Sequence, residues 1–172
     1  AIVDTHCPGL LYANLAVRGR RIGDVLHNQL PRALAMDPDL ITVCIGMNDV
    51  TRPGKAFTAA LADLDEIYSQ LAASGATVVT TTFPEVARML PVGRLIDARV
   101  RQINDVITAA SRCHGFGLVD LYSAPSMSET RIWSHDRMHA SALGHRLFAE
   151  AAAEALNLPG SNNDWAQPSG DE

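Results

Sequence analysis

Apolar runs of strand length alternate along this chain with segments of helical periodicity. The run "LITVCIG" at 40–46 is β-branched and continuously apolar, which is typical of a strand buried on both faces. Comparable runs are "LLYANLAV" at 10–17, "ATVVTTTF" at 76–83 and "GLVDLY" at 117–122. Because strands that alternate with helices form parallel sheets covered on both faces, we expect one α/β domain with three layers.

The helical segments lie between these runs. The clearest ends at Gly75 and carries apolar side chains at helical spacing: Phe57, Leu61, Leu64, Tyr68 and Leu71. Further helices are expected at 22–30, where Pro31 breaks or restarts the helix, at 96–107, and from a cap at Ser141 onward. The polar end, 160–172, is expected to be a disordered tail, so that the domain spans 1–159.

Composition excludes several classes of partner. The 172 residues carry a formal net charge of −5 and no basic run, so we expect no nucleic-acid partner. Apolar runs are too short to span a membrane, and no signal peptide is evident. Three scattered cysteines form no disulfide or zinc pattern, and free thiols without a leader favour the cytoplasm. The sequence carries no signal for oligomeric state.

Ligands of parallel sheets bind beyond the carboxyl ends of the strands, so the loops after the four runs are the places to look. None of these loops is a Gly-rich phosphate loop, and no cofactor is expected. After the third run, "FPEVARMLPVGRL" is compatible with an acyl pocket or an ordinary lid. It mixes apolar with basic side chains: Met89, Leu90, Val92, Arg88 and Arg94.

Two loops offer hydrogen-bond donors. The run at 40–46 leads into "GMNDV", where the amide of Asn48 can stabilise an anion on a substrate oxygen, although Gly, Asn and Asp also favour plain turns. A Gly-x-Asn-Asp string is expected only about 0.04 times by chance in such a chain. The first run leads to Gly19, whose N–H can approach a ligand closely or simply form a turn.

A carboxylate and an imidazole lie three residues apart just before the last helix. In "WSHDRMHASALGH", Asp136 can hold one ring nitrogen of His139 while the other nitrogen accepts a proton. An Asp-x-x-His string is expected about 0.5 times by chance, so this pair alone is not specific. A helix cap at Ser141 does not require a histidine at 139, which favours the catalytic interpretation.

Taken together, "NLAVRG", "GMNDV" and "DRMHASALGH" resemble the later sequence blocks of the SGNH hydrolases, also called GDSL-type lipases and esterases. The resemblance implies a flavodoxin-like α/β/α fold and hydrolysis of a small-molecule ester without a metal. It implies His139 as general base, Asp136 as its orienting acid, and Asn48 and Gly19 as oxyanion donors. These four residues are the predicted catalytic set.

The family's nucleophile, however, lies in a Gly-Asp-Ser motif after a first strand, and this chain contains no such string. We therefore expect the first strand and its serine to be absent, which makes the chain inactive by itself. One alternative is a non-catalytic module that kept the cleft. Another is a hydrolase with a different nucleophile beside His139, either Ser134 or a metal-activated water.

Overall fold

The structure is a computed structural model that describes residues 2–85, 87 and 93–168. The helices are α1 (Ile2–His6), α2 (Ile22–Asp24), α3 (Leu30–Leu34), α4 (Gly54–Ala73), α6 (Gly93–His114) and α7 (Ala142–Ala155). The strands are β1 (Leu40–Val43), β2 (Thr77–Thr81) and β3 (Gly117–Val119). A π-helical turn, η1 (Val25–Gln29), joins α2 to α3. The short 3₁₀ turns are η2 (Met47–Asp49), η3 (Pro125–Ser128), η4 (Thr130–Ile132) and η5 (Asp164–Ala166).

The three strands form a parallel sheet in the order β1-β2-β3. Ile41 pairs with Val78, and Val79 pairs with Gly117, so β2 is the inner strand. The adjacent side chains Val78 and Val79 are both buried but belong to different cores, since neighbouring residues of a strand face opposite sides of the sheet. The sheet is therefore covered on both faces, as the apolar runs predicted.

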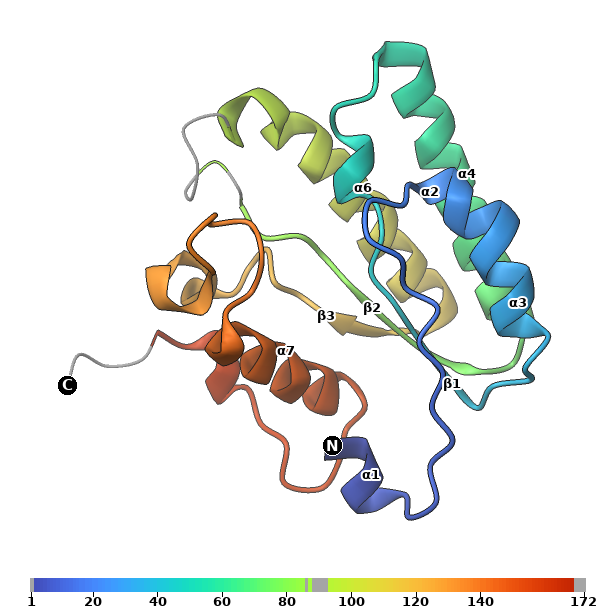
Figure 1. The fold of residues 1–172 in the computed structure, drawn as a ribbon, viewed down its shortest axis with the longest axis vertical. Coiled ribbons are helices and arrows are strands. Elements are labelled where there is room, and N and C mark those ends of the chain that lie inside the picture. The colour runs from blue at the N-terminus through green and yellow to red at the C-terminus, as the bar shows by residue number, and fades with distance from the viewer. Residues whose placement is uncertain (1, 86, 88–92, 169–172) are drawn as a thin grey trace.

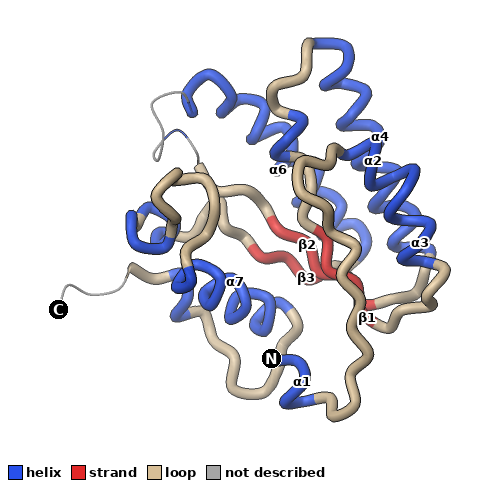
Figure 2. Tube along the Cα trace, in the orientation of Figure 1, coloured by secondary structure: helices blue, strands red, loops and turns tan. Residues whose placement is uncertain are grey.

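Helices form the two outer layers. The stretch from α2 to α3, together with α4 and α6, packs one core, and α7 packs the other with the turns η3 to η5. Figure 1 shows α4 and α6 on one side of the sheet and α7 on the other, and Figure 2 shows the strands between them. This is the three-layer α/β/α arrangement that the sequence predicted.

The prediction of a strand at Leu10–Val17 is wrong. This segment is a loop, and its apolar side chains meet solvent: Leu11 is 96% and Tyr12 80% exposed. In the described part of the chain no strand lies beside β1 on the side away from β2. A strand needs a neighbour for its backbone hydrogen bonds, so an apolar run without one stays outside the sheet.

Two further expectations can be compared with the structure. Of the two alternatives for Pro31, the structure has the restart: a new α-helix, α3, begins at Leu30 and continues to Leu34, and Pro31 lies in its first turn, where no intrahelical N–H bond is lost. The segment expected to be a disordered tail contains η5, whose Trp165 is only 6% exposed and packs in the α7 core.

The predicted acyl pocket or lid mostly cannot be placed. Arg88, Met89, Leu90 and Val92 lie outside the described residues, and Arg94 lies in the first turn of α6.

Candidate active site

The turn before α7 joins the predicted acid and base. His139 Nδ1 lies 2.6 Å from Asp136 Oδ2, and the two side chains are 62% and 50% exposed. The other carboxylate oxygen, Oδ1, accepts the backbone N–H groups of Met138 and His139, each at 3.0 Å. The carboxylate thus holds both the imidazole and the backbone of its own turn.

These hydrogen bonds fix the charge of the carboxylate. The backbone N–H groups of Met138 and His139, and then the His139 side chain, hold the pKa of Asp136 well below its ordinary value. An ionised carboxylate at Nδ1 favours the tautomer that carries its proton on that nitrogen. Nε2 is then the basic nitrogen, on a side chain open to solvent. The pair can therefore accept a proton from a group placed beside Nε2.

The turn is fixed to the rest of the fold at both ends. Ser134 N–H donates to the His139 carbonyl oxygen at 2.7 Å, and Ser141 N–H donates to the Ile132 carbonyl oxygen at 2.9 Å. Arg137, inside the turn, has a φ of +57°, a left-handed conformation that the flanking hydrogen bonds hold. These backbone hydrogen bonds, and not burial of the side chain, fix the position of His139.

Helix α7 can approach this turn because position 144 is a glycine. A Cβ at Gly144 would lie 2.2 Å from the carbonyl oxygen of Ile132. Ser141 caps the helix by accepting the Gly144 N–H at 3.2 Å, and its hydroxyl donates to the Arg131 carbonyl oxygen at 2.8 Å. The expected cap at Ser141 is confirmed, and it joins α7 directly to the segment that carries the Asp136–His139 pair.

The two predicted oxyanion donors also come together. Asn48 Nδ2 donates to the carbonyl oxygen of Arg20 at 2.8 Å, which ties η2 to the turn that contains Gly19. Gly19 has a φ of +79°, where glycine is favoured, and a Cβ added there would meet no atom within 4 Å. An amide carries two N–H groups, and this bond uses one of those of Asn48. A role for the other as an oxyanion donor stays a prediction.

Asp49 supports this loop, a role that the sequence interpretation did not assign. Its side chain is fully buried, accepts the Ile22 N–H at 3.0 Å through Oδ2, and lies 3.2 Å from Arg52 Nη1 through Oδ1. The neighbouring positions 48 and 49 therefore both bind the 20–22 backbone. The only sequence signal was the Asn-Asp pair itself, since a buried carboxylate cannot be recognised from local pattern.

Within the described residues, no hydrogen bond joins Asn48 or Gly19 to Asp136 or His139. All three parallel strands present their carboxyl ends at the same edge of the sheet, and η2 follows β1 there. The loop into α7 lies on the side toward which β2 runs (Figure 1). A cleft shared by the two pairs stays a prediction.

The predicted alternative nucleophile has another role in the structure. The Ser134 hydroxyl donates to the Ala140 carbonyl oxygen at 3.0 Å and is half-buried. This bond directs the hydroxyl to the backbone of the turn, which does not favour Ser134 as a nucleophile. In the described part of the chain, no group of three or more His, Cys, Asp or Glu side chains is placed to hold a metal ion.

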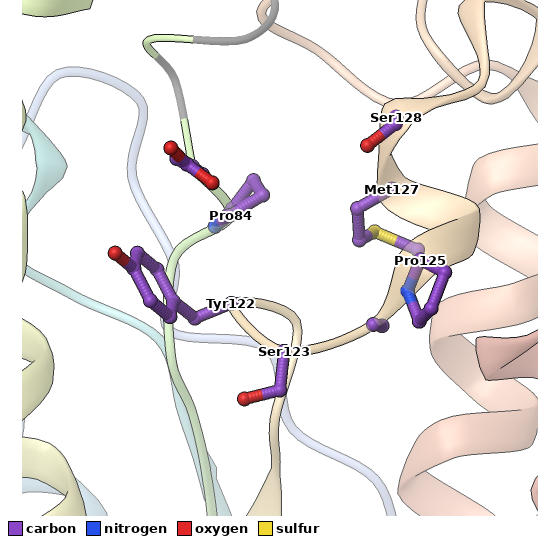
Figure 3. A pocket seen from close by; sticks show the side chains of 8 residues that line it. Pro84, Tyr122, Ser123, Pro125, Met127 and Ser128 are labelled. Carbon is purple, nitrogen blue, oxygen red and sulfur yellow. The ribbon is translucent and has the colours of Figure 1, made fainter.

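A cavity of about 460 Å³ lies beyond the carboxyl ends of β2 and β3. Figure 3 shows Pro84 and Tyr122 on one side of it, and Pro125, Met127 and Ser128 on the other. Trp133 Nε1 donates to the Met127 carbonyl oxygen at 2.9 Å, six residues before His139. The wall of the cavity is therefore bonded to the segment that leads into the Asp136–His139 turn.

The helices do not meet the requirements of a membrane span. Among the described residues, none of them combines the length and the apolar character that crossing a bilayer requires.

Comparison with solved structures identifies the fold. LAE5, an alpha/beta hydrolase enzyme from the metagenome of Lake Arreo, is 21% identical with a TM-score of 0.66, over 81% of this chain and 69% of that one. A variant of Axe2, an acetyl xylan esterase from Geobacillus stearothermophilus, is 18% identical with a TM-score of 0.74, over 94% of this chain and 78% of that one. A member of the lipolytic protein G-D-S-L family from Veillonella parvula is 20% identical with a TM-score of 0.70, over 91% and 86%.

A comparison with curated proteins finds no significant match. The model of the GDSL-like lipase/acylhydrolase family matches residues 2–147, a span that contains Gly19, Asn48, Asp136 and His139. This match covers most of the chain and agrees with the fold of the similar structures, so the chain belongs to the GDSL-like lipase/acylhydrolase family.

Proposed function

We propose that this chain supplies the base, the acid and the oxyanion donors of a serine-type ester hydrolase, and that the nucleophile is supplied by a strand it does not contain. Membership of the acylhydrolase family gives the coarser function, hydrolysis of acyl esters. The finer proposal concerns the mechanism and the named residues. His139 accepts the proton of the serine, Asp136 orients His139, and Asn48 with Gly19 holds the oxyanion.

The observation that carries the proposal is the 2.6 Å contact between His139 Nδ1 and Asp136 Oδ2. A carboxylate that stays ionised at that distance stabilises the imidazolium that forms when Nε2 takes a proton. An exposed His–Asp pair that served only as a surface ion pair would contribute little to stability. The arrangement is better suited to moving a proton.

The open edge of β1 supports the proposal that a further strand carries the nucleophile. Among the described residues β1 pairs with β2 and with no other strand, Thr42 is exposed, and the apolar segment 10–17 lies outside the sheet. An unpaired edge offers N–H and C=O groups to an added strand. A strand at that edge would end beside η2, next to Asn48, because parallel strands end at the same side of a sheet.

The experiment extends the chain at its amino end with a strand and a Gly-Asp-Ser turn of the family type. Several of the similar structures, the Axe2 variant among them, are acetyl xylan esterases, so acetyl esters are the first substrates, with 4-nitrophenyl acetate as the probe. We expect His139→Ala to reduce kcat by at least 100-fold. Asn48→Ala should reduce kcat by roughly 100-fold with little change in KM, because an oxyanion donor acts on the transition state.

Arg146→Ala, on the exposed face of α7, is the matched control and should leave kcat unchanged. If Asn48→Ala raises KM and leaves kcat intact, Asn48 binds substrate and the oxyanion assignment is wrong. If an active extended chain keeps its rate in His139→Ala, the proposed base is wrong.

A further inference from the structure

The turn that contains Gly19 carries three arginines within four residues. Arg18, Arg20 and Arg21 belong to a chain that has a formal net charge of −5 and only 14 lysines and arginines in all. All three are exposed. They form no extended basic surface of the kind that binds nucleic acid, but they concentrate positive charge at one point of an acidic protein.

The backbone of this turn is fixed beside Asn48. The Arg20 carbonyl oxygen accepts the Asn48 amide at 2.8 Å, and the Arg20 N–H donates to the Val17 carbonyl oxygen at 3.3 Å. The Ile22 N–H, directly after the turn, donates to the buried Asp49 carboxylate at 3.0 Å. The backbone that carries the arginines therefore holds its place without a ligand.

Two carboxylates bonded to this part of the chain already have arginine partners. Asp24 lies 3.4 Å from Arg20 Nη1 through Oδ1 and accepts the Arg21 N–H at 3.1 Å through Oδ2. Asp49 lies 3.2 Å from Arg52 Nη1 through Oδ1 and accepts a backbone N–H through Oδ2. Asp24 therefore balances the charge of Arg20, and Asp49 balances the charge of Arg52.

Two guanidinium groups of the turn are left without such a partner. Among the described residues, neither Arg18 nor Arg21 forms an ion pair with a carboxylate. A Cβ added at Gly23 would lie 3.6 Å from Asp63 Oδ2, so this aspartate is nearby, but it pairs with neither arginine. A guanidinium has only N–H donors, arranged in a plane that matches the oxygens of a carboxylate or a phosphate. The turn thus offers two unpaired cations next to Asn48.

We propose that the Arg18–Arg21 turn binds an anionic group of the substrate, a carboxylate or a phosphate, beside the oxyanion donors. Arg18 and Arg21 pair with the oxygens of that group, while Gly19 and Asn48 hold the oxyanion. The preferred substrate is then an acidic ester. The inference rests on the proposed ester hydrolase only for the statement that the bound anion belongs to an ester.

The test measures binding by the 172-residue chain at fixed ionic strength, without turnover. Monomethyl succinate, methyl butanoate and methyl phosphate are each titrated while the backbone amides of 19–22 and the side-chain amide of Asn48 are followed by NMR. The first two are methyl esters of similar size that differ by one carboxylate.

We expect the anions to shift these resonances, and the tighter of the two identifies the anionic group as carboxylate or phosphate. Methyl butanoate should bind roughly five- to 25-fold more weakly than the tighter anion, because each exposed ion pair contributes at most about a factor of five.

Variants locate the bound anion. Arg18→Gln and Arg21→Gln should each weaken its binding roughly two- to five-fold. The double variant should bring the anion and methyl butanoate within about two-fold of each other. Arg112→Gln, which changes an exposed arginine in the last turn of α6, is the matched control and should leave the affinities unchanged.

The proposal is overturned if methyl butanoate binds as tightly as the anions, if neither anion shifts these resonances, or if Arg112→Gln weakens binding as much as Arg18→Gln and Arg21→Gln do. Failure of the proposed function gives a different result. In that case the anion still binds at the turn, but an extended chain shows no hydrolysis that depends on His139. Conversely, such hydrolysis without anion binding at the turn would leave the mechanism intact and reject this role of the arginines.

Discussion

At the scale of single residues, the Asp136–His139 turn combines exposure with a fixed geometry. The carboxylate accepts two backbone N–H groups and contacts the imidazole, so its orientation does not depend on burial. Short polar turns of this type can hold a catalytic base at the surface, where a substrate can reach Nε2. Serine hydrolases need that accessibility for proton transfer to and from the nucleophile.

The charge of Asp136 is testable directly. Its folded-state pKa lies below the ordinary value near 3.9, so ionisation of Asp136 stabilises the folded turn above about pH 4, and this contribution is lost as the pH falls further. A ¹³C NMR titration of the carboxyl carbon should give a midpoint well below the ordinary value. In His139→Ala the midpoint should rise only in part, since the backbone N–H groups remain.

A complete return of the midpoint to the ordinary value in that variant would show that the imidazole alone holds the charge. The backbone account of the turn would then be wrong.

Asp49 allows a second test at this scale. Asp49→Ala removes the acceptor of the buried Ile22 N–H and the partner of Arg52, so the free energy of unfolding should fall by roughly 1–3 kcal/mol. Urea denaturation measures this loss. Asp65→Ala, an exposed aspartate on α4, should change the free energy of unfolding by less than about 0.5 kcal/mol. If the two changes lower the free energy of unfolding equally, Asp49 does not stabilise the loop as described.

At the scale of elements, the sequence predicted the helices and strands whose apolar side chains recur at regular spacing within the element itself. The side chains Phe57, Leu64 and Leu71 identified α4, and the run at 40–46 identified β1, although the strand itself ends at Val43. The run at 10–17 is also apolar and forms no strand. The composition of a segment indicates that it can form a strand, but pairing also requires a neighbouring strand from elsewhere in the sequence.

In the candidate site, too, contacts between residues close in sequence could be predicted and contacts between distant residues could not. The Asp136–His139 contact spans three residues, so spacing sufficed to predict it. The hydrogen bond from Asn48 to Arg20 spans 28 residues, and the hydrogen bond from Ile22 to Asp49 spans 27. The sequence suggested Asn48 and Gly19 as donors from their places in two loops and from the family resemblance, and it did not predict these two bonds. The cavity at Pro84 and Tyr122 joins two loops whose contact no local pattern encodes.

The packing of α7 against the Asp136–His139 turn gives a prediction for an element. Gly144→Ala places a methyl group against the Ile132 carbonyl oxygen, so the helix must shift, at a cost of roughly 1–3 kcal/mol in the free energy of unfolding. The same shift should perturb the NMR resonances of His139. Gly54→Ala at the start of α4 is the control, because a Cβ added there would meet no atom within 4 Å. Unchanged stability in Gly144→Ala would contradict the close contact.

At the scale of the whole molecule, the three-stranded sheet leaves two features without partners among the described residues. β1 has an unpaired edge, and segment 10–17 exposes apolar side chains, with Val17 52% exposed. Both invite association with another strand, from a second copy or from a separate segment. The proposed function requires that the strand which pairs with β1 also carries the nucleophilic serine.

The most direct measurement is an esterase assay of the purified 172-residue chain, alone and after addition of a peptide that carries a family-type first strand with its Gly-Asp-Ser turn. With 4-nitrophenyl acetate, we expect no turnover above background from the chain alone, because its sequence contains no Gly-Asp-Ser motif that could supply the nucleophile. Addition of the peptide should produce turnover that His139→Ala abolishes. Turnover by the chain alone that depends on His139 would contradict the account, as would peptide-induced turnover that survives His139→Ala.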